Sequence, residues 1–451
     1  MKASRAALVV AACGALLAAR GDDFGFDEEA PAVPADPWAG ITQLFPSGAG
    51  FGEGRSPAPS LSLVGEYDLP DTAPEGLSGI AWTSNPGHPH FVDPDPFGRA
   101  GGPGPLFDLC TPDSYVLCED SGAWLDFAEI GIDHASGAIT SAVFRVRSRA
   151  YFYFGEPHET ADFEAIAYAP SRHNWTHLQL YVSDEAHPHI WQDRLDPCTT
   201  GVVAMPSPIR RLDLPDVLRA HRPNKGVEAM CLSPDDQALW LANEDALPED
   251  GPVATAEHGA LVRLVRTDAL QGVARLRPET IIPTQWWFYE LDPATGTSFP
   301  HLPDPFNGLV ALCALPDGRL LALERSFGFR TRSADDPRGS LITISIYLID
   351  PLHAEGAENN HHAESAEGAE SPSAARRSGR AVARPDRLAK TLIWRGLTGR
   401  SNYEGMTLGP ELADGSRALL LVADGDVTRK GRFSFAWRKS LLAFRVRMPQ
   451  H

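Results

Sequence analysis

A hairpin motif that recurs five times along the chain limits the folds that this sequence can adopt. In its clearest copy, at residues 224–245, an apolar run carrying Glu228 leads through a Ser-Pro-Asp-Asp turn to a second apolar run that ends at Asn243 and Glu244. Two short apolar runs around such a turn predict a β-hairpin. The other copies begin near residues 74, 162, 307 and 402. Repetition of a β-hairpin along one chain predicts a propeller or a solenoid.

The copies share acidic residues at matching places. Four first runs carry a glutamate, namely Glu75, Glu164, Glu228 and Glu404, and Val310 stands there in the remaining copy. The second runs end in further acids, including Asp184, Glu244, Glu324 and Asp424. The first strand of every propeller blade lines the central channel. We therefore expect the four glutamates to face one another across the channel, with the other acids nearby.

The length of 451 residues would allow two or three domains, but the repeat favours one all-β domain, a single β-propeller over residues 61–448. Five motif copies are visible, yet the length of this segment favours six blades. Strands at 61–69 and 440–447 should share one blade, because that pairing removes an open edge. The formal net charge of −19 makes nucleic acid an improbable partner. We expect a monomer.

The ends and one internal segment differ from the repeat. Residues 1–20 begin with Lys2 and Arg5 and continue with an apolar run too short to span a bilayer, which predicts a signal peptide or a lipoprotein signal. Cys13 stands in a lipobox-like context, so lipid anchoring is an open alternative. Either signal predicts export to the periplasm, the cell envelope or the medium. Residues 21–60 should form a flexible linker, and residues 353–384 a disordered insertion.

Several ordered motifs then suggest a family. They are Glu-Gly-Leu-Ser-Gly-Ile-Ala-Trp, Asp-Phe-Glu-Ala-Ile-Ala, Asn-Lys-Gly-Val-Glu-Ala-Met, Leu-Ala-Leu-Glu-Arg-Ser-Phe and Asn-Tyr-Glu-Gly-Met-Thr-Leu. From about residue 61 to 446 the chain resembles the bacterial phytase-like, esterase-like propellers. The resemblance implies an exported propeller with calcium-dependent hydrolysis of phosphoesters or esters. The chain departs from the family pattern at Val310, where a carboxylate is usual, and at Ala165 and Ala229, where glycine is usual.

Convergent carboxylates repel one another and raise each other's pKa unless a cation neutralises them. Calcium accepts six to eight oxygen ligands in irregular geometry. The expected calcium ligands are Glu75, Glu164, Glu228, Glu404, Asp184, Glu244, Glu324 and Asp424. The alternative is structural: each glutamate could accept backbone N–H bonds from the neighbouring blade and hold the two blades together.

The catalytic candidates are Glu228, Glu164 and Arg325, and the candidates for binding an anionic substrate are Lys225 and Arg325. Ser78 lacks the GxSxG context of a serine hydrolase. The two His-Pro-His segments, at residues 88–90 and 187–189, fit loops better than a metal site. The sequence therefore predicts a calcium-dependent hydrolase of a small phosphoester or ester. The alternative is a non-catalytic propeller of the cell envelope that binds a ligand or a protein.

Overall fold

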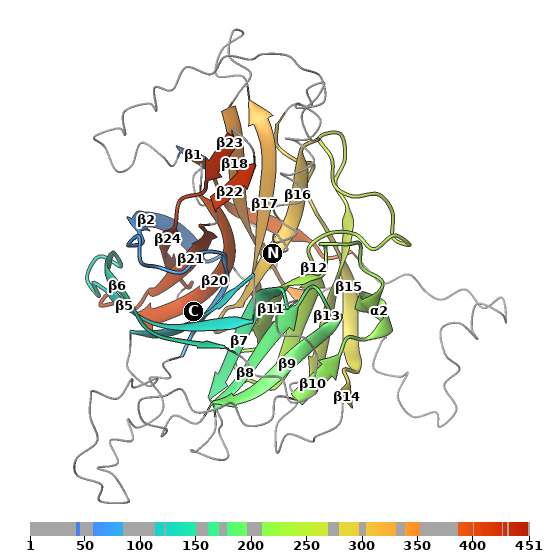
Figure 1. Cartoon of the computed structure of the whole chain (residues 1–451), viewed down its shortest axis with the longest axis horizontal. Coiled ribbons are helices and arrows are strands. Elements are labelled where there is room, and N and C mark those ends of the chain that lie inside the picture. Colours follow the sequence, from blue (N-terminus) through green and yellow to red (C-terminus); the bar gives the residue numbers. More distant parts are fainter. Residues whose placement is uncertain are drawn as a thin grey trace, which may run out of the picture.

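A computed structural model of the protein consists almost entirely of strands (Figure 1). It describes residues 42–45, 57–83, 113–120, 123–149, 161–170, 178–195, 210–268, 279–296, 304–330, 339–351, 387–399, 401–425, 427–430 and 433–449. The expected signal at residues 1–20 and the expected insertion at 353–384 lie outside these ranges. In the described part of the chain, no helix is long and apolar enough to cross a membrane.

The strands form five blades, each written here from the channel outwards. Blade 1 is β3 (Leu77–Trp82), β4 (Ser114–Glu119), β5 (Trp124–Ile132) and β6 (Ile139–Arg149). Blade 2 is β7 (Phe163–Pro170), β8 (Leu178–Asp184), β9 (His189–Leu195) and β10 (Arg210–Asp213), extended by β14 (Glu279–Thr280). Blade 3 is β11 (Val227–Leu232), β12 (Ala238–Asn243), β13 (Leu261–Asp268) and β15 (Pro283–Glu290).

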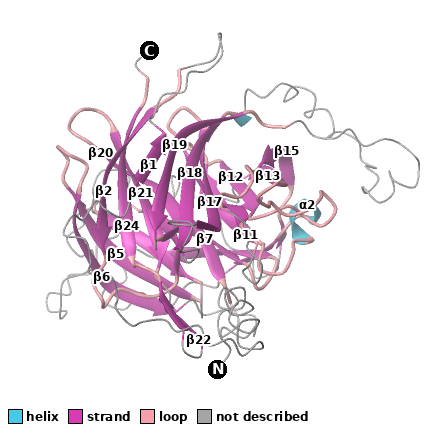
Figure 2. Cartoon of the chain, turned by 90° about the horizontal axis from the view of Figure 1, so that it is seen from above, coloured by secondary structure: helices cyan, strands magenta, loops and turns pink. Residues whose placement is uncertain are grey.

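Blade 4 is β16 (Phe306–Ala314), β17 (Leu320–Arg330), β18 (Gly339–Ile349) and β19 (Lys390–Gly399), extended by β1 (Thr42–Phe45). Blade 5 is β20 (Asn402–Glu411), β21 (Arg417–Asp424), β24 (Ser440–Arg447) and β2 (Ser60–Asp68). A separate hairpin pairs β22 (Val427–Lys430) with β23 (Phe433–Ala436), and α2 (Asp216–Arg219) is one short helical turn. Figure 2 shows the strands from above, with this hairpin at the rim.

The described residues thus build five blades, one for each motif copy, and not the six that the length favoured. The innermost strands touch in the order β3, β7, β11, β16, β20 and then β3 again, so the ring is closed. Chain length is an indirect measure of blade number, whereas each described blade contains one copy of the motif. Within the expected linker, residues 42–45 form β1, which pairs with β19 at the edge of blade 4.

The closing blade joins the two ends of the domain, as predicted. β2 pairs with β24 in antiparallel register from Ser60 opposite Arg447 to Asp68 opposite Ser440. Glu66 of β2 strengthens this join, because its carboxylate accepts hydrogen bonds from Tyr403, at 2.8 Å, and from Ser401, at 2.9 Å. The outermost strand of blade 5 therefore comes from the beginning of the domain, while the other three come from its end.

The seams between blades are filled by apolar side chains. Trp287 and Tyr289 of blade 3 are buried together with Leu309 and Leu312 of blade 4 in one cluster. Burial of such large side chains contributes most of the favourable free energy in a β-protein. The seams hold the innermost strands in fixed positions around the axis, which in turn fixes the geometry of the channel.

Candidate functional site

All five innermost strands bulge at the same level of the channel. In each strand the register against its neighbour shifts by one residue near its beginning. The residues at this level are Ser78, Glu164, Glu228, Val310 and Glu404. They line one small cavity and so surround the axis. The structure therefore brings together three of the four glutamates that the sequence placed in the channel.

Glu75 is the exception, and its expected role as a calcium ligand was wrong. It precedes β3, its side chain is 60% exposed, and its nearest cation is Lys439, with 3.8 Å between Oε1 and Nζ. Ser78 occupies the channel position that corresponds to Glu404. The sequence comparison aligned Glu75-Gly76 with Glu404-Gly405, whereas the strand register aligns Glu404 with Ser78, the residue that bulges after Leu77.

A second set of side chains stands at the end of the hairpins, next to the glutamates. The residues at this level are Asp120, Glu185, Glu244, Arg325 and Asp424. Asp120, Glu185, Glu244 and Asp424 stand where the second strand of their blade ends, opposite the residue that precedes the first strand or begins it. In blade 4 both strands continue past this level, and Arg325 stands within β17 opposite Gly308 of β16. Glu244 and Asp424 are thus where the sequence placed them, and both are buried. Arg325 replaces a carboxylate at this level in blade 4.

Three carboxylates of blade 2 form the tightest acidic group. One oxygen each of Asp162, Glu164 and Glu185 lies within 4.8 Å of the other two. Burial, and then repulsion from Asp162, raises the pKa of Glu185 to about 8. The same two causes raise the pKa of Glu164 well above its ordinary value. No other three His, Cys, Asp or Glu residues of the described ranges meet this distance limit.

The sequence motif contained Asp162, but our ligand prediction did not include it. The corresponding residues in the other blades are Gly76, Gly226, Gly308 and Asn402, so the repeat gives no sign of an acid here. A signal was nevertheless present. Asp162 and Glu164 are separated by one residue at the start of a strand, a spacing that directs two side chains towards the same face.

Two cations balance part of the acidic charge. Lys225 Nζ pairs with Glu244 Oε2, and Arg325 Nη2 donates to Glu244 Oε1 at 2.8 Å. Arg325 Nη1 also pairs with Glu404, whose carboxylate accepts a hydrogen bond from Asn402 at 2.8 Å. Burial alone would lower the pKa of Arg325, but these carboxylates outweigh it and raise the pKa. Both cations expected to bind substrate are therefore already paired with carboxylates.

The pKa values of Glu228 and Glu244 are shifted in opposite directions. Burial, followed by the charges of Glu244 and Glu185, raises the pKa of Glu228 well above its ordinary value. Burial would raise the pKa of Glu244 too, but Lys225 and Arg325 lower it, and a hydrogen bond from Glu228 lowers it further. Carboxyls whose surroundings separate their pKa values in this way divide the acid and base roles between them. Glu228 thus holds the proton, and Glu244 is the carboxylate that accepts the bond.

Glu185, at the end of the second strand of blade 2, makes the kind of bond between blades that the structural alternative expected of the glutamates in the first strands. Glu185 Oε1 accepts a hydrogen bond from the backbone N–H of Gly226, in the next blade, at 2.7 Å. A Cβ on Gly226 would lie 2.8 Å from Glu185 Cγ, and a Cβ on Gly308 would lie 2.4 Å from Glu244 Oε1. Both glycines make room for a carboxylate that crosses from the preceding blade. Glu185 therefore joins two blades and also faces Asp162 and Glu164.

Two expected calcium ligands instead have structural roles. Asp184 accepts hydrogen bonds from Trp191 Nε1, at 3.1 Å, and from the backbone N–H of Asp162, at 3.2 Å. Glu324 accepts hydrogen bonds from Tyr289, Asn307 and Lys390, and from the backbone N–H of Asp292. Both residues are buried. Successive side chains of a strand point to opposite faces. Asp184 and Glu324 therefore point away from the face that carries Glu185 and Arg325.

Ser78 and the described histidines are held in structural contacts. Ser78 Oγ donates to the carbonyl of Phe163 at 2.5 Å, so its proton is directed away from the channel. His187 stacks on His189 with 5.6 Å between ring centroids, and His187 Nδ1 lies 3.0 Å from Asp184 Oδ2. The second His-Pro-His segment, at residues 88–90, lies outside the described residues. His187 and Pro188 lie in the β8–β9 turn as expected, whereas His189 begins β9.

Fold and site together define a five-bladed β-propeller whose channel is acidic at one end. The family model for phytase-like proteins, described as esterase-like activity of phytase, matches residues 107–427. The chain therefore belongs to the phytase-like family. None of the curated proteins matches this sequence.

Solved structures give only distant likenesses. The aldose sugar dehydrogenase of Streptomyces coelicolor, in its PQQ-bound form, is 12% identical with a TM-score of 0.34, over 86% of this chain and 98% of that one. A protein from Lactobacillus plantarum is 11% identical with a TM-score of 0.30, over 74% and 71%. A chain of the Chaetomium thermophilum Polycomb Repressive Complex 2 is 8% identical with a TM-score of 0.31, over 86% and 98%. Likeness at this level does not bear on activity.

Proposed function

We propose that the acidic end of the channel binds a calcium ion and that the protein hydrolyses a small phosphoester or carboxylic ester there. The observation that carries the proposal is the meeting of Asp162, Glu164 and Glu185 within 4.8 Å of one another. Calcium is bound by oxygen ligands of this kind and tolerates irregular geometry. The three carboxylates replace the wider ligand set that the sequence suggested, and Glu228, Glu244 and Glu404 surround them.

The protonation of this group also supports a bound cation. Burial and mutual repulsion raise the pKa of Glu164 and Glu185, so the ionised forms are unfavourable when no positive charge is near. A calcium ion would supply that charge and would polarise a phosphoryl or carbonyl oxygen of the substrate. Binding should then release protons from these carboxyls, because a carboxyl must be ionised to bind a metal strongly.

The chain supplies a proton donor close to the proposed cation. Glu228 keeps its proton because its pKa is raised well above the ordinary value. We assign it the role of general acid, which protonates the leaving oxygen of the ester. Lys225 and Arg325 keep Glu244 ionised, so Glu244 can hold the Glu228 carboxyl in place through the hydrogen bond between them. Arg325 thus becomes a positioning residue in place of a direct ligand of the substrate.

This charge pattern favours substrates with few negative charges. Lys225 and Arg325 are both paired with carboxylates, so little positive charge remains to bind a polyanion. We propose a monoester with one phosphate, or an uncharged carboxylic ester. From the sequence we also propose that the protein is exported, with a lipid anchor as the alternative to a cleaved signal, and that it is a monomer. Residues 1–20, which carry the signal, lie outside the described ranges.

Calcium titration of the purified protein tests the proposal. Calcium at about 100-fold above its dissociation constant should add about 2.7 kcal/mol of stability by mass action and so raise Tm. It should also increase the turnover of p-nitrophenyl phosphate or p-nitrophenyl acetate. Glu164→Gln should remove both responses. Glu257→Gln, an exposed carboxylate outside the channel, is the matched control and should retain both.

A second variant separates binding from chemistry. Glu228→Gln keeps the size of the side chain but cannot donate an acidic proton, so calcium should still raise Tm while turnover falls about 100-fold or more. If chelation changes neither Tm nor turnover of the wild-type protein, the calcium site and the hydrolase are both wrong.

A non-catalytic binding propeller is the second candidate. It is favoured by Ser78 and Val310, which interrupt the ring of glutamates in two of the five blades. Under this function, calcium would raise Tm without producing turnover of either p-nitrophenyl ester. The same titration therefore distinguishes the two candidates.

A further inference from the structure

The channel is closed below the glutamates by a ring of apolar side chains. The residues two positions after the bulge are Ile80, Ile166, Met230, Leu312 and Met406, and they line both the small acidic cavity and a larger one beyond it. Alternation along the strands places the acidic and apolar side chains in successive layers of the channel. The larger cavity is therefore a separate compartment, divided from the proposed hydrolytic site by this apolar ring.

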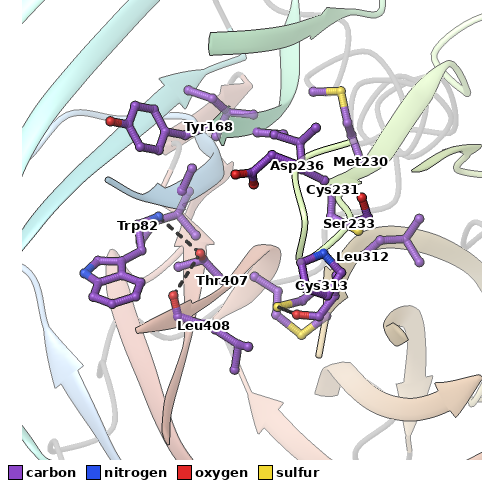
Figure 3. A pocket seen from close by; sticks show the side chains of 18 of the residues that line it. Trp82, Tyr168, Met230, Cys231, Ser233, Asp236, Leu312, Cys313, Thr407 and Leu408 are labelled. Carbon is purple, nitrogen blue, oxygen red and sulfur yellow. Dashed lines mark hydrogen bonds between the residues drawn. The ribbon is translucent and has the colours of Figure 1, made fainter. Parts of the chain in front are cut away.

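The larger cavity, shown in Figure 3, has a volume of about 340 Å³. Small-molecule sites have volumes of roughly 300–1,000 Å³. Its wall is formed by the residues two positions farther along the same strands, namely Trp82, Tyr168, Leu232, Ala314 and Leu408. Its floor is the apolar ring. Most of the residues that line this cavity thus have aliphatic, thioether or aromatic side chains.

Most polar groups at this cavity are already bonded within the protein. Thr407 Oγ1 accepts a hydrogen bond from the backbone N–H of Trp82 at 3.2 Å and donates to the carbonyl of Leu408 at 3.2 Å. The sulfur of Cys231 accepts a hydrogen bond from the backbone N–H of Ala314. Ser233 Oγ donates to Asp235 at 2.5 Å, within its own turn. These side chains have little hydrogen-bonding capacity left for a ligand.

Arg417 is the cation at this cavity. Its Nε and Nη2 donate to the carbonyl of Gly409 at 3.2 and 3.0 Å, and its guanidinium lies over the Trp82 ring, 5.2 Å from the centroid. Among the described residues, no carboxylate lies within ion-pair distance of it, and Nη1 has donors to spare. Asp236, on the β11–β12 turn, is the one described carboxylate in the lining.

We propose that this cavity binds a small monocarboxylate with an unbranched apolar chain. The chain would occupy the space above the apolar ring, and the carboxylate would pair with Arg417 beside Trp82. Met230 and Met406 suit such a chain, because thioether side chains adapt their shape to a flexible apolar ligand. This site is independent of the proposed hydrolysis, since the apolar ring lies between the two cavities.

Calorimetric titration of the full chain tests the proposal with octanoate, octan-1-ol and octylammonium, each with and without calcium. Octanoate should bind one site and bind about tenfold more tightly than octanol, since a charge-assisted hydrogen bond is worth about this much. Octylammonium should bind more weakly than octanol. Calcium should not change the number of octanoate molecules bound, which separates this test from that of the hydrolytic site.

Arg417→Gln should reduce octanoate affinity to that of octanol. Arg266→Gln is the matched control, because Arg266 also lies over a tryptophan ring, 6.0 Å from the centroid of Trp240, but outside this cavity. It should bind octanoate as the wild type does. Ala314→Phe, which fills the cavity, should weaken both octanoate and octanol. The proposal fails if folded wild-type protein does not bind octanoate, or binds octylammonium as tightly. It also fails if Arg417→Gln leaves octanoate affinity unchanged.

Discussion

Glu185 carries a pH dependence that can be measured directly. Its pKa is about 8 in the folded protein against an ordinary value of 4.5. Between these two values the folded protein holds a proton that the unfolded chain has released, so stability must fall as pH rises through this window. We expect the Tm of the calcium-free protein to fall from about pH 5 to about pH 8. Glu185→Gln should flatten that profile, and Glu257→Gln should not. An equally steep profile for Glu185→Gln would contradict the assignment.

Calcium should oppose the same effect. Because the ion favours the ionised carboxylates, its affinity should increase with pH over the range in which Glu185 loses its proton. Titrations at about pH 6 and pH 8 measure this, with proton release followed in weak buffer. An affinity that does not depend on pH would place the ion elsewhere.

At the same scale, the sequence predicted the kind of site but not its full membership. Glu164, Glu228 and Glu404 were predictable because each follows the same apolar pattern and so reaches the same level of the channel. Glu75 was misplaced because the register after a bulge cannot be derived from matching residue types. Asp162 was missed because glycine or asparagine occupies its position in the other blades, where the proposed ion has no ligand.

At the scale of the strand, a side chain from one blade bonds the backbone of the next. The sulfurs of Cys231 and Cys313 accept the N–H groups of Ala314 and Leu408, and Thr407 does the same for Trp82. The two cysteines occupy corresponding positions in β11 and β16, and both thiols are buried and free. Their role as acceptors could not be predicted, because it depends on the spacing between strands that are not paired.

We expect this contact to contribute measurably to stability. Cys313→Ala removes the acceptor from Leu408 N–H and leaves a small void, and should cost about 1–2 kcal/mol. Cys313→Ser keeps an acceptor of similar size and should cost less. Urea unfolding of the two variants and the wild type compares them. If serine is at least as damaging as alanine, packing and not the hydrogen bond is what matters at this seam.

At the scale of the whole molecule, the pairing of the two ends was predictable and the number of blades was not. A ring of blades leaves an edge unless the first and last strands meet, and this physical requirement holds for any blade number. Length is an indirect measure of blade number, because it does not say how many residues each blade takes. The five motif copies gave the better count, since each inner hairpin needs its own sequence signal.

Closure by β2 should account for a large share of the stability of the ring. Two chains compare its presence and absence: one begins at residue 57 and keeps β2, and the other begins at residue 70 and lacks it. The shorter chain loses the backbone pairing with β24, the buried side chain of Leu61 and the hydrogen bonds of Glu66. It also exposes an open sheet edge. We expect its Tm to be much lower, or the chain to aggregate, while the longer chain unfolds like the full protein.

Restoring the strand from outside tests whether closure itself is responsible. A peptide of residues 57–70 should bind the exposed β24 edge by strand addition and raise the Tm of the shorter chain. The same peptide with Glu66→Ala should rescue less, because Ser401 and Tyr403 would lose their shared acceptor. Equal Tm values for the two chains would mean that the ring holds without this strand. If both peptides raise the Tm of the shorter chain equally, the backbone pairing of β2 with β24 would account for the closure, without a contribution from Glu66.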